Sequence, residues 1–130
     1  MTAPAIHGSC LCGAVQFDLL PPLRPVILCH CQQCRKTSGH VWAATSVSQD
    51  RFHLARDEGL AWFASSEKAT RGFCTCCGSS LFWQPTGGQT ISVAAGALDG
   101  ATGLAIMEQW FTQDRGDYYT LDPNIPCREG

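Results

Sequence analysis

The chain has 130 residues, about the length of one domain, with a net charge of −2, 15% charged residues and 45% hydrophobic residues. This balance excludes a disordered chain, and it excludes a nonspecific nucleic-acid binder because no basic stripe is available for phosphate contacts. No stretch approaches the roughly 20 apolar residues that cross a membrane, and the first residues lack the pattern of a secretory signal. We therefore expect one cytoplasmic domain, residues 1–130, with no membrane partner.

Short apolar runs bounded by turn residues recur along the chain, which is typical of an all-β domain. In chain order they predict strands at residues 14–19, 26–28, 41–48, 52–55, 61–64, 72–73, 80–84, 91–95, 106–112 and 118–121. Residues 31–38 lack strand alternation and end at Gly39, so they predict one short helical turn that carries Cys34, Arg35 and Lys36. The predicted fold is a small, single all-β domain of packed antiparallel sheets.

Cysteine spacing is the strongest chemical signal of the chain. Eight of its nine cysteines fall into three tight clusters, Cys10-x-Cys12, Cys29-x-Cys31-x-x-Cys34 and Cys74-x-Cys76-Cys77. An odd number of cysteines cannot all pair within one chain, and the cytoplasm disfavours disulfides. Close cysteines bring their sulfur atoms toward a common point, where a tetrahedral zinc ion takes four donors about 2.3 Å away. The clusters therefore predict two zinc ions, one with four ligands and one with three.

Cys74-x-x-Cys77 followed by Gly78 has the form of a zinc knuckle, in which the glycine lets the backbone fold under the metal. Such a knuckle needs two further ligands. Cys10-x-Cys12 also ends in a glycine and stands at the start of a predicted strand. A site made of these four cysteines would tie the amino-terminal segment to the second half of the chain, where closing a long loop stabilises most.

The remaining cluster, Cys29, Cys31 and Cys34, is predicted to hold the second zinc ion. Three protein ligands leave a fourth position for water or a substrate thiol, which is the usual arrangement of catalytic zinc. The adjacent Arg35 and Lys36 are candidates to bind an anionic group of the substrate, although solvated surface positions explain them equally well.

Spacing leaves three questions open. The second site has an open position in one interpretation and is completed by Cys76, His30 or another residue in the other. Cys76 either replaces Cys74 or Cys77 as a ligand or packs beside the site as a free thiol. Cys127, close to the end of the chain, is expected to bind nothing.

Three segments of the sequence resemble the signatures of the glutathione-dependent formaldehyde-activating enzyme family, which includes centromere protein V. The segments follow one another in the family's order and span most of the chain: Gly8-Ser-Cys-Leu-Cys-Gly13, Cys29-His-Cys-Gln-Gln-Cys-Arg-Lys-Thr-Ser-Gly39 and Arg71-Gly-Phe-Cys-Thr-Cys-Cys-Gly-Ser-Ser-Leu81. The chain departs from many relatives at Glu108, where they carry a histidine.

This resemblance implies packed β-sheets around two zinc sites. It assigns the structural zinc to Cys10, Cys12, Cys74 and Cys77 and the substrate-side zinc to the other cluster. It also implies formation of S-hydroxymethylglutathione from glutathione and formaldehyde, which is classed as a carbon–sulfur lyase activity. Glutathione or another small thiol is the expected partner.

Our hypothesis from the sequence is a zinc-dependent carbon–sulfur lyase that acts on a thiol adduct of a small aldehyde or another electrophile. The first alternative is a non-catalytic, zinc-stabilised binding module in which both ions only support the fold. The second alternative is a thiol oxidoreductase, which requires Cys76 or Cys127 to be free, exposed and acidic. The number of protein ligands at the second site separates the hypothesis from its first alternative.

Overall fold

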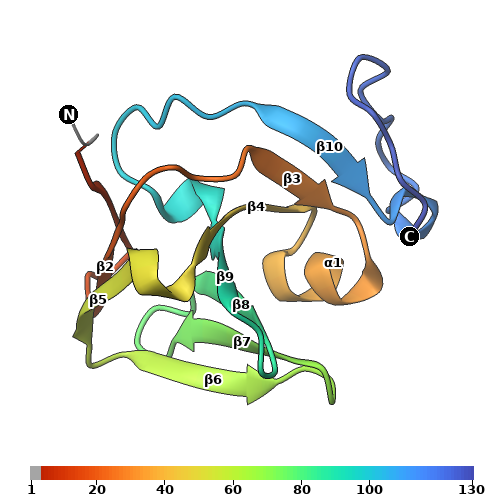
Figure 1. Cartoon of the computed structure of the whole chain (residues 1–130). Helices are drawn as coiled ribbons and strands as arrows, with labels where there is room; N and C mark the ends of the chain where they lie inside the picture. Colours follow the sequence, from red (N-terminus) through yellow and green to blue (C-terminus); the bar gives the residue numbers. More distant parts are fainter. Residues whose placement is uncertain (1–3) are drawn as a thin grey trace.

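A computed structural model describes residues 4–130, in which strands form a three-stranded and a seven-stranded sheet (Figure 1). The small sheet has the order β1 (Ile6–Ser9), β2 (Val15–Leu19), β5 (Phe52–Asp57). The large sheet has the order β10 (Ile106–Trp110), β3 (Val26–Cys29), β4 (Trp42–Ser48), β9 (Thr90–Ala94), β8 (Ser80–Pro85), β7 (Ala69–Cys74), β6 (Leu60–Ala64). The helices are α1 (Gln32–Ser38) and the short 3-10 turns η1 (Gln49–Arg51), η2 (Ala95–Ala97) and η3 (Thr112–Asp114).

This architecture confirms the predicted all-β class and the short helix before Gly39. All named strand pairs are antiparallel except β10 with β3, which run parallel, so the large sheet is mixed rather than purely antiparallel. The parallel pair forms because the chain leaves β9 and crosses back through η2 before it enters β10. None of the helices in residues 4–130 has the length and apolar content that a membrane crossing requires.

Each predicted strand overlaps an observed one except residues 118–121, where the prediction is wrong. That segment lies in turns and bends, and its tyrosine rings pack against histidines instead of pairing in a sheet. The sequence also gave no signal for β1, whose four residues include Gly8. A Cβ atom on Gly8 would lie 2.4 Å from the Phe17 ring, so β1 approaches β2 as closely as it does only with glycine there.

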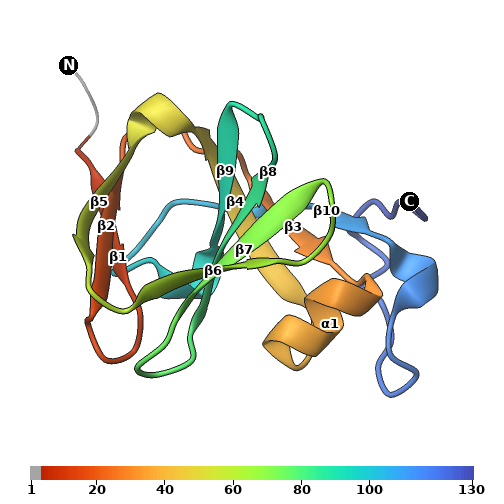
Figure 2. The same cartoon turned by 90° about the horizontal axis from the view of Figure 1, so that it is seen from below.

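The main core lies between the two sheets. Phe17 of the small sheet meets Phe82 of the large sheet edge to face, with ring centroids 5.0 Å apart, and Phe52 packs against both rings. Figure 2 shows the small sheet at one end of the molecule and α1 with the carboxy-terminal segment at the other. The three-cysteine cluster described below lies away from this aromatic core, whereas Cys10 and Cys74 of the four-cysteine cluster belong to it.

A second, smaller apolar cluster lies on the opposite face of the large sheet. Successive side chains of a strand point to opposite faces, so Ile91 and Val93 of β9 join the main core while Ala94 joins the second cluster. In β4, Trp42 and Ala44 likewise belong to the second cluster. The large sheet thus supports a separate face on which cysteines from β3 and α1 pack.

Candidate metal centres

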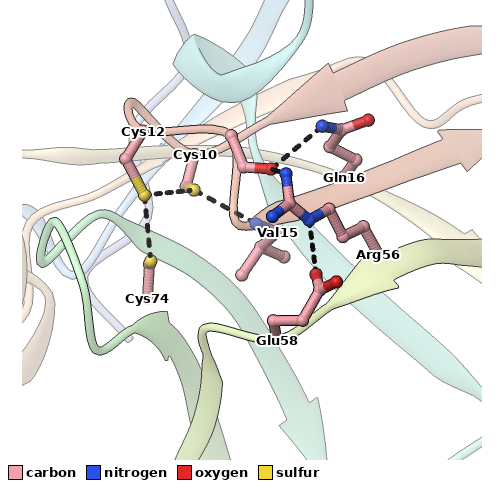
Figure 3. Close-up of polar contacts among 8 residues, drawn as sticks. Cys10, Cys12, Val15, Gln16, Arg56, Glu58 and Cys74 are labelled. Atoms are coloured by element: carbon pink, nitrogen blue, oxygen red, sulfur yellow. Dashed lines mark hydrogen bonds and ion pairs between the residues drawn. The ribbon is translucent and has the colours of Figure 1, made fainter.

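The cysteines at positions 10, 12, 74 and 77 converge on one point, with their four sulfur atoms within 4.8 Å of one another. The Sγ atom of Cys12 lies 3.7 Å from the Sγ atoms of Cys10 and Cys74 (Figure 3). A tetrahedral site with metal–sulfur bonds of 2.3 Å has sulfur–sulfur edges of about 3.8 Å. The cluster therefore has the dimensions of a four-coordinate metal site, and its ligands are far from bonding distance for a disulfide.

Two glycine turns shape this cluster. Gly13 and Gly78 have φ values of +83° and +80°, and each donates its backbone N–H to the carbonyl of the first cysteine of its motif, at 3.3 Å for Cys10 and 2.8 Å for Cys74. The backbone N–H of Val15 also points at the Sγ atom of Cys10, 3.3 Å away (Figure 3). These are the knuckle turns that the sequence predicts.

Ser79 joins the two knuckles. Its hydroxyl accepts a hydrogen bond from the backbone N–H of Leu11 at 3.1 Å and lies 3.2 Å from the Sγ atom of Cys77. The Ser79 hydroxyl and backbone N–H lower the pKa of Cys77 to about 5, which favours the thiolate that a metal ion requires.

Cys29, Cys31 and Cys34 also come together, with their sulfur atoms within 4.8 Å of one another. Among residues 4–130, no fourth cysteine, histidine or carboxylate joins this group. Cys29 ends β3, Cys31 caps the amino terminus of α1, and Cys34 lies in its first turn. The three-cysteine cluster thus offers three sulfur donors, and a metal ion bound there would keep a fourth coordination position free of protein ligands.

The pKa values of the three thiols indicate why this cluster suits a cation. Hydrogen bonds with Cys29 and Cys34 lower the pKa of Cys31 to about 2, whereas hydrogen bonds with Cys31 and Cys34 raise the pKa of Cys29. One thiolate is therefore stabilised by its neighbours, but three negative charges in one place repel each other. A divalent cation removes this conflict and allows all three sulfurs to ionise.

A cavity of about 510 Å³ opens beside the three-cysteine cluster. Cys29, Cys31 and Cys34 line it together with aromatic side chains and three cationic side chains. The aromatic residues are Trp42, Trp83, Trp110 and Phe111, and the cationic ones are Arg24, Lys68 and Arg71. No carboxylate of the described residues lines the cavity, so its charge favours anionic ligands.

Arg71 is the cation that lies next to the cluster. Its Nη2 atom is 3.6 Å from the Sγ atom of Cys34, and its guanidinium lies over the ring of Trp42, 5.7 Å from the centroid. Arg71 begins the third segment that resembles the family, and nothing in the sequence indicates a role for it. Its position could be found only from the fold, because β7 brings it across the sheet to α1.

The two cations predicted for substrate binding lie elsewhere. Arg35 and Lys36 project from α1, Lys36 is exposed, and neither lines the cavity. Cys76 and Cys127 are exposed and belong to neither cluster. Glu108, where many relatives have histidine, forms an ion pair with Arg128 at 2.6 Å and does not line the cavity either.

His30 lies between two of the clustered cysteines but points away from them. It is 1% exposed, its Nδ1 atom forms a hydrogen bond with the Tyr119 hydroxyl, and the two rings stack with centroids 5.6 Å apart. Tyr118 meets His40 in the same way, with the hydroxyl 2.5 Å from Nδ1. The carboxy-terminal segment is thus fastened over the loop that holds the cluster.

Comparison with known proteins agrees with this arrangement. The family model for glutathione-dependent formaldehyde-activating enzymes matches residues 5–114. An uncharacterized lyase of Schizosaccharomyces pombe is 28% identical over 117 residues, which are 89% of this chain and 85% of that protein. A Halomonas elongata protein, provisionally named a glutathione-dependent formaldehyde-activating enzyme, is 31% identical over 108 residues, or 72% of this chain and 66% of its own length.

The fold also matches a solved structure. A Rhodobacter sphaeroides protein determined by X-ray crystallography superimposes with a TM-score of 0.59 at 24% identity, covering 77% of this chain and 97% of that one. This match supports the fold alone. The family model extends over most of the chain, and the chain therefore belongs to the glutathione-dependent formaldehyde-activating enzyme family.

Proposed function

We propose that the chain is a zinc-dependent carbon–sulfur lyase with two zinc ions in different roles. Cys10, Cys12, Cys74 and Cys77 hold a structural ion, and the three-cysteine cluster holds a second ion that faces substrate. The sulfur–sulfur distances of 3.7 Å and the all-thiolate donor set support zinc in the first site. The observation that carries the catalytic assignment is the second cluster, which has three sulfur donors and borders a cavity of about 510 Å³.

The substrate that fits best is a small anionic thiol, such as glutathione, together with formaldehyde. Family membership supports this pair, and the cationic lining of the cavity suits the carboxylates of a peptide thiol. Zinc in the second site would supply a Lewis acid that binds the substrate thiol and lowers its pKa. The unpaired thiols of the clusters also favour a reducing compartment such as the cytoplasm.

The side chains of the cavity position the substrate around this centre. Trp42 and Trp83 form an apolar wall that excludes water from the reacting sulfur. Phe111 lines the same cavity with a backbone φ of +56°, a conformation that a residue with a side chain adopts at a cost of roughly 1–2 kcal/mol. Strained residues of this kind concentrate at functional sites.

Two-dimensional exchange NMR tests the proposal, because it measures the exchange rate at equilibrium with the protein and in a protein-free sample under the same conditions. We expect the zinc-loaded wild type to accelerate exchange between formaldehyde and S-hydroxymethylglutathione, and Cys31→Ser to lose the acceleration together with one zinc ion. Cys127→Ser is the matched control, because this thiol is exposed and lies outside both clusters. If the wild type matches the protein-free rate, the lyase proposal with this substrate is wrong, and a binding module remains.

A further inference from the structure

The guanidinium of Arg71 is buried without enough partners. Arg71 is 6% exposed, and in the described part of the chain its Nε and Nη1 atoms have no hydrogen-bond partner. A buried cation normally forms hydrogen bonds with all its donors, because its charge has left water. The contact with Cys34 uses one nitrogen, and the stacking on Trp42 leaves the other N–H groups unused. This imbalance indicates a ligand that supplies the missing acceptors.

Arg71 lies beside the three-cysteine cluster, where the proposed reaction would take place. Its Nη2 atom is 3.6 Å from the Sγ atom of Cys34, one of the three sulfurs that would hold the proposed zinc ion. In a thiol adduct of an aldehyde, the aldehyde oxygen is only two bonds from the substrate sulfur. The carboxylates of glutathione are several bonds farther from the substrate sulfur than the aldehyde oxygen is. Exposed cations that line the cavity, such as Lys68, are therefore better placed to bind them.

We propose that Arg71 is a catalytic residue that binds the aldehyde oxygen and stabilises the alkoxide that develops on it; this proposal rests on the lyase function. In the addition direction, the thiol proton passes to water and a sulfur electron pair forms the carbon–sulfur bond. The π pair of the carbonyl moves to oxygen, which then takes a proton from water. In the lyase direction the hydroxyl loses its proton, the carbon–sulfur bond breaks and the carbonyl forms again, without any change of redox state.

Arg71 acts in this step through charge and hydrogen bonds. A guanidinium stays protonated at all working pH values, so it does not serve as the acid or base. Fixed donors aimed at a developing oxyanion act most strongly in a site from which water is excluded, and the loss of one such donor commonly lowers kcat by 10²–10³-fold. The two tryptophans and Phe111 provide this excluded site.

The kinetic test compares Arg71→Gln and Arg71→Lys with Arg51→Gln, a change of an arginine whose side chain bonds to the Pro21 carbonyl and does not line the cavity. We expect Arg71→Gln to lower kcat of the exchange at least 30-fold with KM changed less than 3-fold. Arg71→Lys should recover part of the loss, and Arg51→Gln should match the wild type. Zinc content and the unfolding midpoint are measured in parallel. An unchanged kcat in a folded, zinc-loaded Arg71→Gln protein overturns the proposal.

A binding test distinguishes oxyanion binding by Arg71 from a purely structural role of Arg71. It also distinguishes this proposal from the proposed lyase function. Calorimetric titration of the zinc-loaded proteins uses two probes, glutathione sulfonate, which carries oxygen atoms on sulfur, and S-methylglutathione, which carries a methyl group there. Arg71→Gln should weaken sulfonate binding at least tenfold and leave S-methylglutathione within twofold. Equal losses for both probes, or no preference of the wild type for sulfonate, would contradict the proposal. If the wild type prefers sulfonate but shows no exchange above the protein-free rate, the lyase function fails while oxyanion binding by Arg71 stands.

Discussion

At the scale of single residues, the four-cysteine cluster depends on a close backbone approach as well as on its ligands. The backbone of Gly59 lies directly against Cys74, and it is held there because its carbonyl accepts hydrogen bonds from the backbone and hydroxyl of Thr75, at 2.7 Å and 3.0 Å. A Cβ atom on Gly59 would lie 2.7 Å from the Cys74 sulfur and 3.0 Å from the Cβ atom of Ala14. Neither neighbour can move without changing the knuckle geometry.

We therefore expect Gly59→Ala to lower the free energy of unfolding by about 1–3 kcal/mol, the usual cost of overpacking, and to weaken metal retention in the four-cysteine cluster. Gly96→Ala is the matched control, because a Cβ atom on Gly96 meets nothing within 4 Å. Urea unfolding and metal analysis after dialysis measure both effects. Equal stability of the two variants would show that the Cys74 loop tolerates displacement.

The sequence alone could not predict which aromatic and cationic side chains line the cavity. Trp83 and Arg71 come from neighbouring strands, while Trp42 comes from a strand three positions away from Arg71's in the large sheet. Their proximity depends on strand order, which no local pattern encodes. The two cysteine clusters were predictable because metal binding restricts the spacing of cysteines within a few residues.

At the scale of elements, helix α1 sets the position of the second cluster. Its first residue follows Cys31, whose sulfur accepts the backbone N–H of Cys34 at 3.4 Å, and it ends at Gly39. Gly39 has φ +88° and donates its N–H to the carbonyl of Arg35 at 2.8 Å. This left-handed residue closes the helix at its seventh residue, and glycine adopts the conformation without strain.

Replacing Gly39 by alanine should destabilise α1 by about 1 kcal/mol, because a side chain in the left-handed region meets the backbone. Since α1 carries Cys34, we also expect a weaker three-cysteine site, seen as faster zinc loss to a chelator. Gly39→Asn is the comparison, since asparagine tolerates this region better. If the asparagine and alanine variants release zinc at the same rate, the helix end does not control the site.

The same glycine explains why α1 was predictable and two other elements were not. A helix-stop glycine and a lack of alternation are local signals, as are the β-branched and aromatic residues of most strands. Residues 118–121 gave the same signal without forming a strand, because Tyr118 and Tyr119 form hydrogen bonds with His40 and His30, respectively. β1 forms because β2 supplies its partner, so its own composition carries little information.

At the scale of the whole molecule, the two cysteine clusters join segments that differ greatly in their separation along the chain. Cys12 and Cys74 are 62 residues apart in the chain, and their cluster fastens the start of the small sheet to the end of β7 in the large sheet. The second cluster spans only the turn from β3 into α1. The two clusters therefore close loops of very different length, and we expect them to contribute differently to the free energy of unfolding.

The two sites should therefore respond differently to ligand loss. A cross-link that closes a loop of about 60 residues is worth about 4 kcal/mol, so Cys12→Ser should lose one metal ion and much of the free energy of unfolding. Cys31→Ser should also lose one ion, but with a small change in unfolding, because the segment it closes is short and already hydrogen-bonded in α1. Elemental analysis should give two metal ions per wild-type chain and one in each variant, and thermal unfolding compares their midpoints.

Cys76→Ser serves as the control, since this cysteine lies outside both clusters. If Cys31→Ser destabilises as much as Cys12→Ser, the second ion supports the fold rather than the chemistry, and the binding-module alternative gains the advantage.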